Sequence, residues 1–272
     1  MKESYLGKVS LFFGLSLLFL SGCSSAPVRV EIPNAPVTDE KKASILEENL
    51  GSAGYYFMVL NFKLVDDVKT VNRLNRIGAR LAHYTERPNI VYKYFIIDSK
   101  YRNAFSMPDG YIFFTNSLIK TLGDDEKIAA VMAHEIAHIT HKHALQSYER
   151  LKGYNPLRSI LGEDVFRVAT ELGYNQAYEL QADQTSLRYL YRAGYDPQSA
   201  FNVLGDLKKI EEEDEKMFKE DQAQKDKKAE KIERKFLDTH PYSENRIVNV
   251  RNYLEQVYKE EKVLYKPEDF NF

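Results

Sequence analysis

The chain has 272 residues, 43% of them hydrophobic, and a formal net charge of −2. This near-balance of charge excludes the strongly basic surface that most nucleic-acid-binding proteins carry, and the length suits one sizeable domain or two small ones. The single cysteine excludes an intramolecular disulfide, so the fold depends on its core, with or without a metal.

Residues 1–22 have the layout of a secretory signal peptide. The apolar run Leu11–Leu20 is shorter than the roughly 20 residues that a membrane-spanning helix needs. Leu20-Ser21-Gly22-Cys23 resembles the bacterial lipobox, whose cysteine is lipidated and becomes the first residue of the mature protein. We therefore expect a lipid anchor on Cys23, with a permanent membrane-anchoring helix as the alternative. Ser24 stands where an aspartate would resemble an inner-membrane retention signal, which implies the outer membrane, facing the periplasm.

Residues 23–40 contain three prolines, which is typical of an extended tether, and residues 41–272 are expected to form one domain. Within residues 41–84 the pattern predicts two helices. The first ends near Gly51 to Gly54, and the second covers Val65–Leu81, where apolar residues recur at helical spacing.

Two later segments predict a small sheet. Ile90–Ile97 and Tyr111–Thr115 are rich in β-branched and aromatic residues, which favour strands. The turn sequence Met107-Pro108-Asp109-Gly110 precedes the second segment and predicts a hairpin. The expected fold class is therefore mainly α with a small β-sheet.

A helix that carries candidate metal ligands follows. An N-cap at Asp124 opens it, and Ile128–Ala144 continues it without Gly or Pro. It contains His134-Glu135-Ile136-Ala137-His138, whose two histidines lie on one helix face, one turn apart, and can bind one metal ion together. Glu135 points about 100° around the helix from His134. There it is close enough to a water on the metal to take its proton as a general base.

The residues around this motif favour a buried helix. Positions 128–133 are apolar, and buried polar groups need a reason such as a metal. The alternative is an ordinary helix surface with solvated histidines and a solvated glutamate. His141 and His143 continue the predicted helix off the ligand face and are expected at the surface or behind the ligands. The metzincin pattern requires glycine at position 141 and histidine at position 144, so that class is excluded.

A third ligand is needed, because catalytic zinc usually takes three from the protein. Glu179 is the candidate, on a helical stretch predicted from about Asp164 to Ala193. Asp183 lies one turn further on the same face, where it would accept the other ring N–H of a zinc-bound histidine and hold that ring. From spacing alone, a solvated acidic face remains the alternative.

Several segments, in this order, resemble one zinc metallopeptidase family. That family contains the beta-barrel assembly-enhancing protease, the heat-shock protease HtpX, the Oma-type mitochondrial peptidase and the prenyl-protein endopeptidases. The segments are Asn103–Ile112, His134–His138, Glu179–Asp183, Ala193–Pro197, Thr239-His240-Pro241 and Arg246-Ile247. The resemblance implies a gluzincin-like zincin domain with one Zn²⁺ per chain, held by the two motif histidines and Glu179, and an endopeptidase activity.

The resemblance also implies how substrate is held. Asn103, Ala104 and Phe105 would pair with the backbone of an extended chain, a mode that favours unfolded or misassembled proteins. His240 would approach the metal, either as a latch or as a hydrogen-bond donor to the oxyanion, and a histidine in a turn is the alternative. The outer-membrane assembly machinery is a candidate partner.

The sequence departs from the family pattern at several points. Asp109 replaces the first glycine of the hairpin turn, which is tolerable if that position needs no positive φ. Asn175 and Gln176 replace a frequent Ser-Arg pair, which puts a nearby arginine contact in doubt. We expect a short lipoprotein member without a tetratricopeptide array or transmembrane helices.

These observations predict a zinc-dependent endopeptidase that acts in protein quality control in the bacterial cell envelope. One rival is a zinc-binding chaperone or scaffold lipoprotein without proteolysis, and Glu135 argues against it because such a protein needs no acid there. A metal-free envelope scaffold is a second rival. The charged stretch 208–235 is expected to be a solvated helical excursion, with partner recruitment as the alternative.

Overall fold

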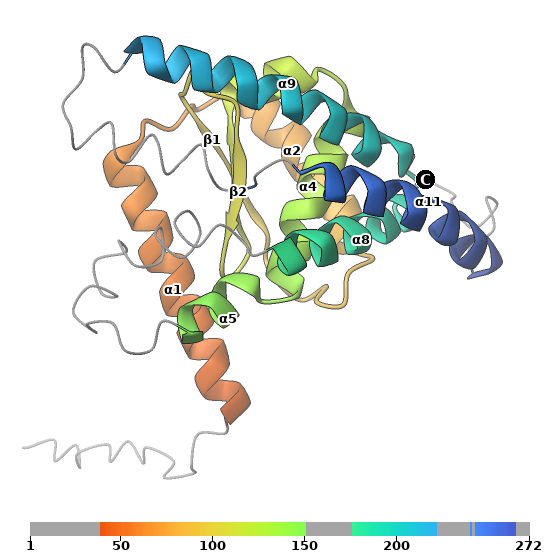
Figure 1. Ribbon diagram of the computed structural model, residues 1–272. Coiled ribbons are helices and arrows are strands. Elements are labelled where there is room, and N and C mark those ends of the chain that lie inside the picture. Colours follow the sequence, from red (N-terminus) through yellow and green to blue (C-terminus); the bar gives the residue numbers. More distant parts are fainter. Residues whose placement is uncertain (1–38, 151–175, 222–239, 241–242, 265–272) are drawn as a thin grey trace, which may run out of the picture. The chain divides into compact units, whose positions relative to one another are not determined.

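The computed structural model describes residues 39–150, 176–221, 240 and 243–264. Its elements are α1 (Asp39–Asn61), α2 (Val68–Ala82), β1 (Lys93–Ile97), β2 (Ala104–Met107), β3 (Tyr111–Thr115), α3 (Asn116–Leu122), α4 (Asp125–Thr140), α5 (His143–Arg150), α8 (Gln176–Arg192), α9 (Gln198–Asp221) and α11 (Glu244–Leu264) (Figure 1). The predicted signal peptide, the lipidated Cys23 and most of the tether lie outside the described residues. In the described part, no helix is long and apolar enough to span a membrane.

The expected fold class is confirmed: the chain is mainly helical and carries one small sheet. The sheet has the order β1-β3-β2, with β1 parallel to β3 and β2 antiparallel to it. Strands β2 and β3 form the predicted hairpin. Because β3 is central, β2 is an edge strand.

The hairpin turn departs from expectation at Asp109. This residue has φ +59°, and Gly110 follows with φ +83°. The condition under which Asp109 was expected to be tolerable, that the position needs no positive φ, is therefore not met, although aspartate enters the left-handed region more readily than most residues. Lys93 holds it, because Nζ donates to the Asp109 carbonyl at 2.9 Å and to Oδ2 at 3.2 Å.

Helix α1 continues through both glycines that were expected to end it. A side chain at Gly51 would place its Cβ 2.4 Å from the Pro108 carbonyl oxygen. This glycine therefore allows the helix backbone to approach the hairpin turn closely, and does not break the helix.

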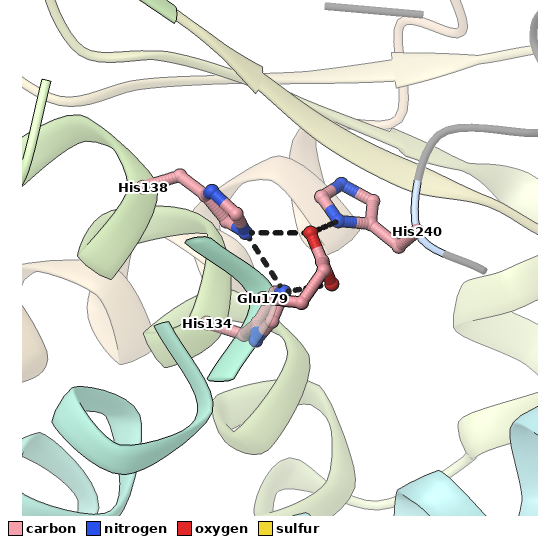
Figure 2. Close-up of side chains that lie close together, drawn as sticks. All are labelled: His134, His138, Glu179 and His240. Carbon is pink, nitrogen blue, oxygen red and sulfur yellow. Dashed lines mark hydrogen bonds and ion pairs between the residues drawn. The ribbon is translucent and has the colours of Figure 1, made fainter. Parts of the chain in front are cut away.

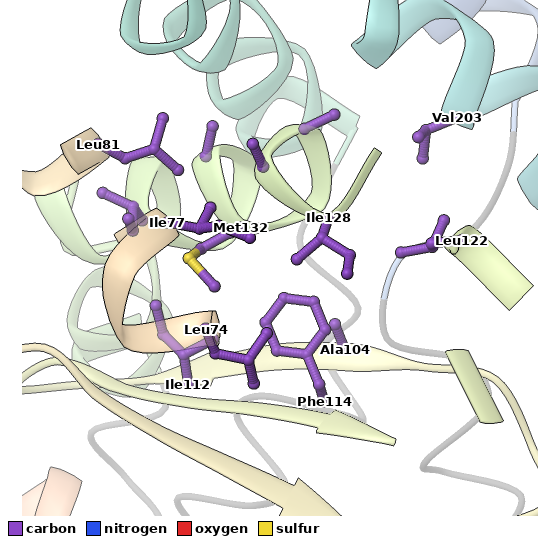
Figure 3. Close-up of a cluster of buried hydrophobic side chains, with 14 of the residues drawn as sticks. Leu74, Ile77, Leu81, Ala104, Ile112, Phe114, Leu122, Ile128, Met132 and Val203 are labelled. Atoms are coloured by element: carbon purple, nitrogen blue, oxygen red, sulfur yellow. The ribbon is translucent and has the colours of Figure 1, made fainter. Parts of the chain in front are cut away.

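The two faces of the sheet pack against different helices. Ala104, Ile112 and Phe114 point toward α2, α4 and α9 in the main core (Figure 3). The alternate residues Phe105 and Phe113 pack against α1 on the other face. Apolar side chains on both faces explain why the strand sequences are almost continuously hydrophobic.

Helix α4 lies in the main core and ends earlier than predicted. Asp124 is its N-cap, as expected, and accepts a hydrogen bond from the Lys127 N–H at 2.8 Å. The helix stops at Thr140, because Lys142 adopts φ +56°, and α5 begins at His143. The predicted continuation to Ala144 is wrong, since a left-handed residue just past a helix ends it even when it is not glycine.

Candidate active site

Three elements bring the predicted site residues together. Helix α4 supplies His134 and His138, α8 supplies Glu179, and His240 lies just before α11 (Figure 2). One potential ligand atom from each of these four residues lies within 4.8 Å of all the others. Near them, Glu135 is buried, and among the described residues no group forms a hydrogen bond with its Oε2.

The donor set fits a tetrahedral metal ion. The Nε2 atoms of His134 and His138 are 3.0 Å apart, and they lie 3.4 and 3.3 Å from the two carboxylate oxygens of Glu179. Ligands about 2.0–2.2 Å from zinc in a tetrahedron are separated by roughly 3.3–3.6 Å. Both distances to Glu179 match this range, and the two histidine nitrogens lie slightly closer together. Two imidazoles and a carboxylate are also ligands that zinc prefers.

Asp183 lies behind one of these histidines. Its Oδ1 is 3.0 Å from His134 Nδ1, which is the contact expected for a residue that orients the ring. Arg246 donates to both carboxylate oxygens of Asp183 and also lies 3.0 Å from Glu179 Oε2. The sequence did not predict these contacts of Arg246, because they depend on how α11 packs against α8. This buried guanidinium supplies the kind of arginine contact that Asn175 and Gln176 had put in doubt.

His143 lies behind the other histidine. Its side chain is completely buried, and its Nδ1 is 2.8 Å from His138 Nδ1. The ring stacks on Tyr178 at a centroid distance of 4.2 Å. His143 therefore takes the position behind the ligands that the sequence left as one of two options. His141 instead contacts Thr185 at 2.8 Å and remains half-buried.

His240 approaches both acidic residues of the site. Its Nδ1 is 3.1 Å from Glu179 Oε1, and its Nε2 is 3.3 Å from Glu135 Oε1. The expectation that this histidine comes near the ligands agrees with the geometry. The latch and the oxyanion donor both remain compatible with these distances.

The electrostatics of the site favour ionised carboxylates beside a cation. Burial alone would raise the pKa of Glu179, but Arg246 and His240 hold it well below its usual value. Burial lowers the pKa of His138 well below its usual range and keeps that ring neutral. Burial also opposes the charge on His134, yet its hydrogen bonds with Asp183 and Glu179 raise its pKa to about 10. Because a metal binds the neutral imidazole, a cation at this site would compete with that proton.

A cleft runs from these residues along α9. Its lining includes Glu135, His240, Asn103 and Ala104, and most of its apolar lining comes from α4 and α9, namely Ala130, Val131, Ala200, Val203, Leu204, Leu207 and Ile210. The side chain of Phe105 is buried against Phe113 on the opposite face of the sheet. Only two of the three residues expected to hold substrate therefore line the cleft.

Comparison with known proteins places the chain among metallopeptidases. Residues 69–254 match the model of Peptidase family M48. The chain is 26% identical to the beta-barrel assembly-enhancing protease of Escherichia coli over 227 residues, which cover 76% of this chain and 43% of that protein. It is 23% identical to the Yersinia pestis protein of the same name, over 89% of this chain and 53% of that protein. The mitochondrial metalloendopeptidase OMA1 of Saccharomyces cerevisiae is 26% identical to the chain, over 56% of this chain and 43% of that protein. The chain thus spans about half the length of these relatives.

Proposed function

The chain belongs to peptidase family M48, and we propose that it is a zinc-dependent endopeptidase of the bacterial cell envelope. The observation that carries the proposal is the close grouping of the Nε2 atoms of His134 and His138 with the carboxylate of Glu179, whose oxygens lie 3.4 and 3.3 Å from them. The M48 match supports it independently. We assign the three residues as ligands of one Zn²⁺.

The residues around the ligands have the chemistry that peptide hydrolysis requires. Bound zinc polarises a carbonyl and lowers the pKa of water. Glu135 accepts the proton of the attacking water and passes it to the leaving amine, and its buried Oε2 is available for this transfer. Asp183 orients His134 by accepting a hydrogen bond from the Nδ1–H of that ring. His240 Nε2 lies 3.3 Å from Glu135 Oε1, which supports a role beside the general base.

The edge strand supports the proposed substrate class. Asn103 and Ala104 line the cleft at the start of β2, and among the described residues no strand pairs with the outer edge of β2. An extended chain that adds to such an edge is bound largely through its backbone. This supports unfolded or misassembled envelope proteins as substrates, in keeping with the name of the beta-barrel assembly-enhancing protease. Phe105 contributes by fixing the strand through its buried ring.

We further propose that lipid on Cys23 anchors the protein to the outer membrane, facing the periplasm. The lipobox-like segment ending at Cys23 supports this placement. Metabolic labelling with a palmitate analogue tests it. Cys23→Ala should abolish labelling and shift the protein out of the membrane fraction, whereas labelling that survives the substitution contradicts the anchor.

The catalytic assignment is tested with Glu135→Gln. The amide cannot act as a base, but it leaves all three ligands, so zinc content should be unchanged while cleavage of an unfolded outer-membrane protein is lost. Activity within a few-fold of wild type would refute the mechanism. Zinc-loaded wild type that cleaves nothing would favour a chaperone or scaffold. Membrane proteomics of cells that produce Glu135→Gln should show substrates accumulating.

A further inference from the structure

A chain of hydrogen-bonding groups leads from the surface of α8 to His138. Gln181 is exposed on α8, and its Oε1 is 3.0 Å from Nε2 of the buried His143. The Nδ1 of His143 is in turn 2.8 Å from His138 Nδ1. The remaining nitrogen of His138, Nε2, faces Glu179 in the site (Figure 2).

The protons along this row of hydrogen bonds can be arranged in two ways. If Gln181 accepts from His143 Nε2–H, then His143 Nδ1 carries a lone pair and accepts from His138 Nδ1–H. The lone pair of His138 is then on Nε2. If the Gln181 amide is turned so that it donates, both rings take the opposite tautomer, and His138 Nε2 carries a proton.

Only the first order allows His138 Nε2 to bind a cation. We propose that His143 and Gln181 are positioning residues that hold His138 in the tautomer protonated on Nδ1, and so present the Nε2 lone pair to the metal. The inference rests on the metal role given to His138 in the proposed function. It assigns no contact with substrate to either residue.

The surroundings of His143 hold its ring in one orientation. The side chain has no solvent exposure, its partner at Nε2 is an uncharged amide, and Tyr178 stacks on it with an interplanar angle of 10°. The two histidine ligands are thus held differently. Asp183, an anion, contacts His134 Nδ1, whereas a neutral imidazole contacts His138 Nδ1.

The test measures zinc affinity by competition with a chromophoric chelator. His143→Phe keeps an aromatic ring for Tyr178 but removes the acceptor, so its dissociation constant for Zn²⁺ should rise by roughly 10- to 100-fold, as is typical when a partner of a metal ligand is lost. His141→Phe is the matched control, because His141 stacks on His143 at 5.3 Å and, among the described residues, makes no contact with the predicted ligands. Equal affinity of the two variants would overturn the proposal.

Gln181 provides a second pair of variants at an exposed position, where folding is not at risk. Gln181→Leu removes the acceptor and should weaken zinc binding. Gln181→Glu retains an oxygen acceptor and should bind zinc as tightly as wild type. Thermal melting of the metal-free variants detects any loss of structure. If wild type itself bound no zinc, the proposed function would fail; if it bound zinc and all variants matched it, only this inference would fail.

A spectroscopic measurement reports the tautomers directly. Long-range proton–nitrogen correlation spectra of zinc-loaded protein labelled with ¹⁵N-histidine distinguish a protonated ring nitrogen from one with a lone pair. We expect His143 protonated on Nε2 and His138 protonated on Nδ1. A proton on His143 Nδ1 would contradict the proposed order.

Discussion

The guanidinium of Arg246 donates one hydrogen bond to each carboxylate oxygen of Asp183, both at 2.8 Å. Asp183 also contacts His134, and Arg246 contacts Glu179, so this ion pair joins α11 to both ligand-bearing helices. All of these side chains are buried.

Loss of the guanidinium should destabilise the fold. Arg246→Ala leaves the buried carboxylates of Asp183 and Glu179 without their cation, which costs about 3–5 kcal/mol of unfolding free energy. Urea unfolding of the metal-free protein measures it. Lys208→Ala is the control, because its ion pair with Glu244 is exposed and should contribute less than about 1 kcal/mol. Similar losses of unfolding free energy in the two variants would show that the buried ion pair stabilises the fold no more than an exposed one.

The ligand assignment predicts a ranking of zinc affinities. His138→Ala and Glu179→Ala each remove a donor and should abolish stoichiometric zinc at micromolar protein concentration. Asp183→Ala removes only the partner of His134 and should weaken binding by roughly 10- to 100-fold. Elemental analysis after dialysis against a weak chelator gives the ranking. Full zinc content in Glu179→Ala would mean that the third ligand is a different residue.

The sequence predicted those parts of the site that depend on local spacing. The two histidines lie one turn apart on α4, and Asp183 lies one turn beyond Glu179 on α8, so helical geometry alone brings each pair to one face. The contacts of Arg246 and His143 depend on how helices pack and where α4 stops. Lys142 ends that helix without glycine or proline, so no local signal marked the turn that sends His143 inward.

A glycine inside α2 shows how packing overrides helix propensity. A Cβ at Gly78 would lie 2.0 Å from Tyr94 Oη and 2.1 Å from Cζ. Although alanine is favoured over glycine by about 1 kcal/mol in a helix, Gly78→Ala should be destabilising by about 1–3 kcal/mol, because the buried ring must move. Gly205→Ala in α9 meets nothing within 4 Å and should be stabilising. Thermal denaturation compares the two, and a stable Gly78→Ala variant would contradict the predicted clash.

Tyr94 contributes to a pH dependence of the free energy of unfolding in the alkaline range. Burial raises its pKa above the 10.0 of an exposed tyrosine. Above pH 10 the unfolded chain therefore releases this proton before the folded chain does, and the free energy of unfolding falls as the pH rises, by at most about 1.4 kcal/mol per pH unit. Tyr94→Phe should reduce the slope between pH 10 and 11 in urea titrations without abolishing it, because the pKa values of Tyr92, Tyr189, Tyr195 and Tyr258 are also raised. The exposed Tyr56, changed to Phe, should leave it as in wild type.

His240 offers two opposite predictions for one substitution. Its Nδ1 lies 3.1 Å from Glu179 Oε1, a separation close to that of two ligands on one tetrahedral zinc, so the imidazole fits the fourth position of the metal. As a fourth ligand it would block the place where water must bind, and it would act as a latch that substrate or a partner opens. As an oxyanion donor it instead stabilises the transition state, and its loss would cost roughly 100- to 1,000-fold in rate.

We expect the latch, because the proposed function, an envelope protease that recognises mainly backbone, requires restraint when no damaged substrate is present. His240→Ala should then raise basal cleavage of an unfolded protein, with zinc still bound by the other three ligands. His83→Ala, at an exposed histidine of the chain, is the control and should leave the rate unchanged. A depressed rate would assign His240 to the oxyanion. An unchanged rate with unchanged zinc affinity would exclude both roles and leave His240 as a residue of its turn.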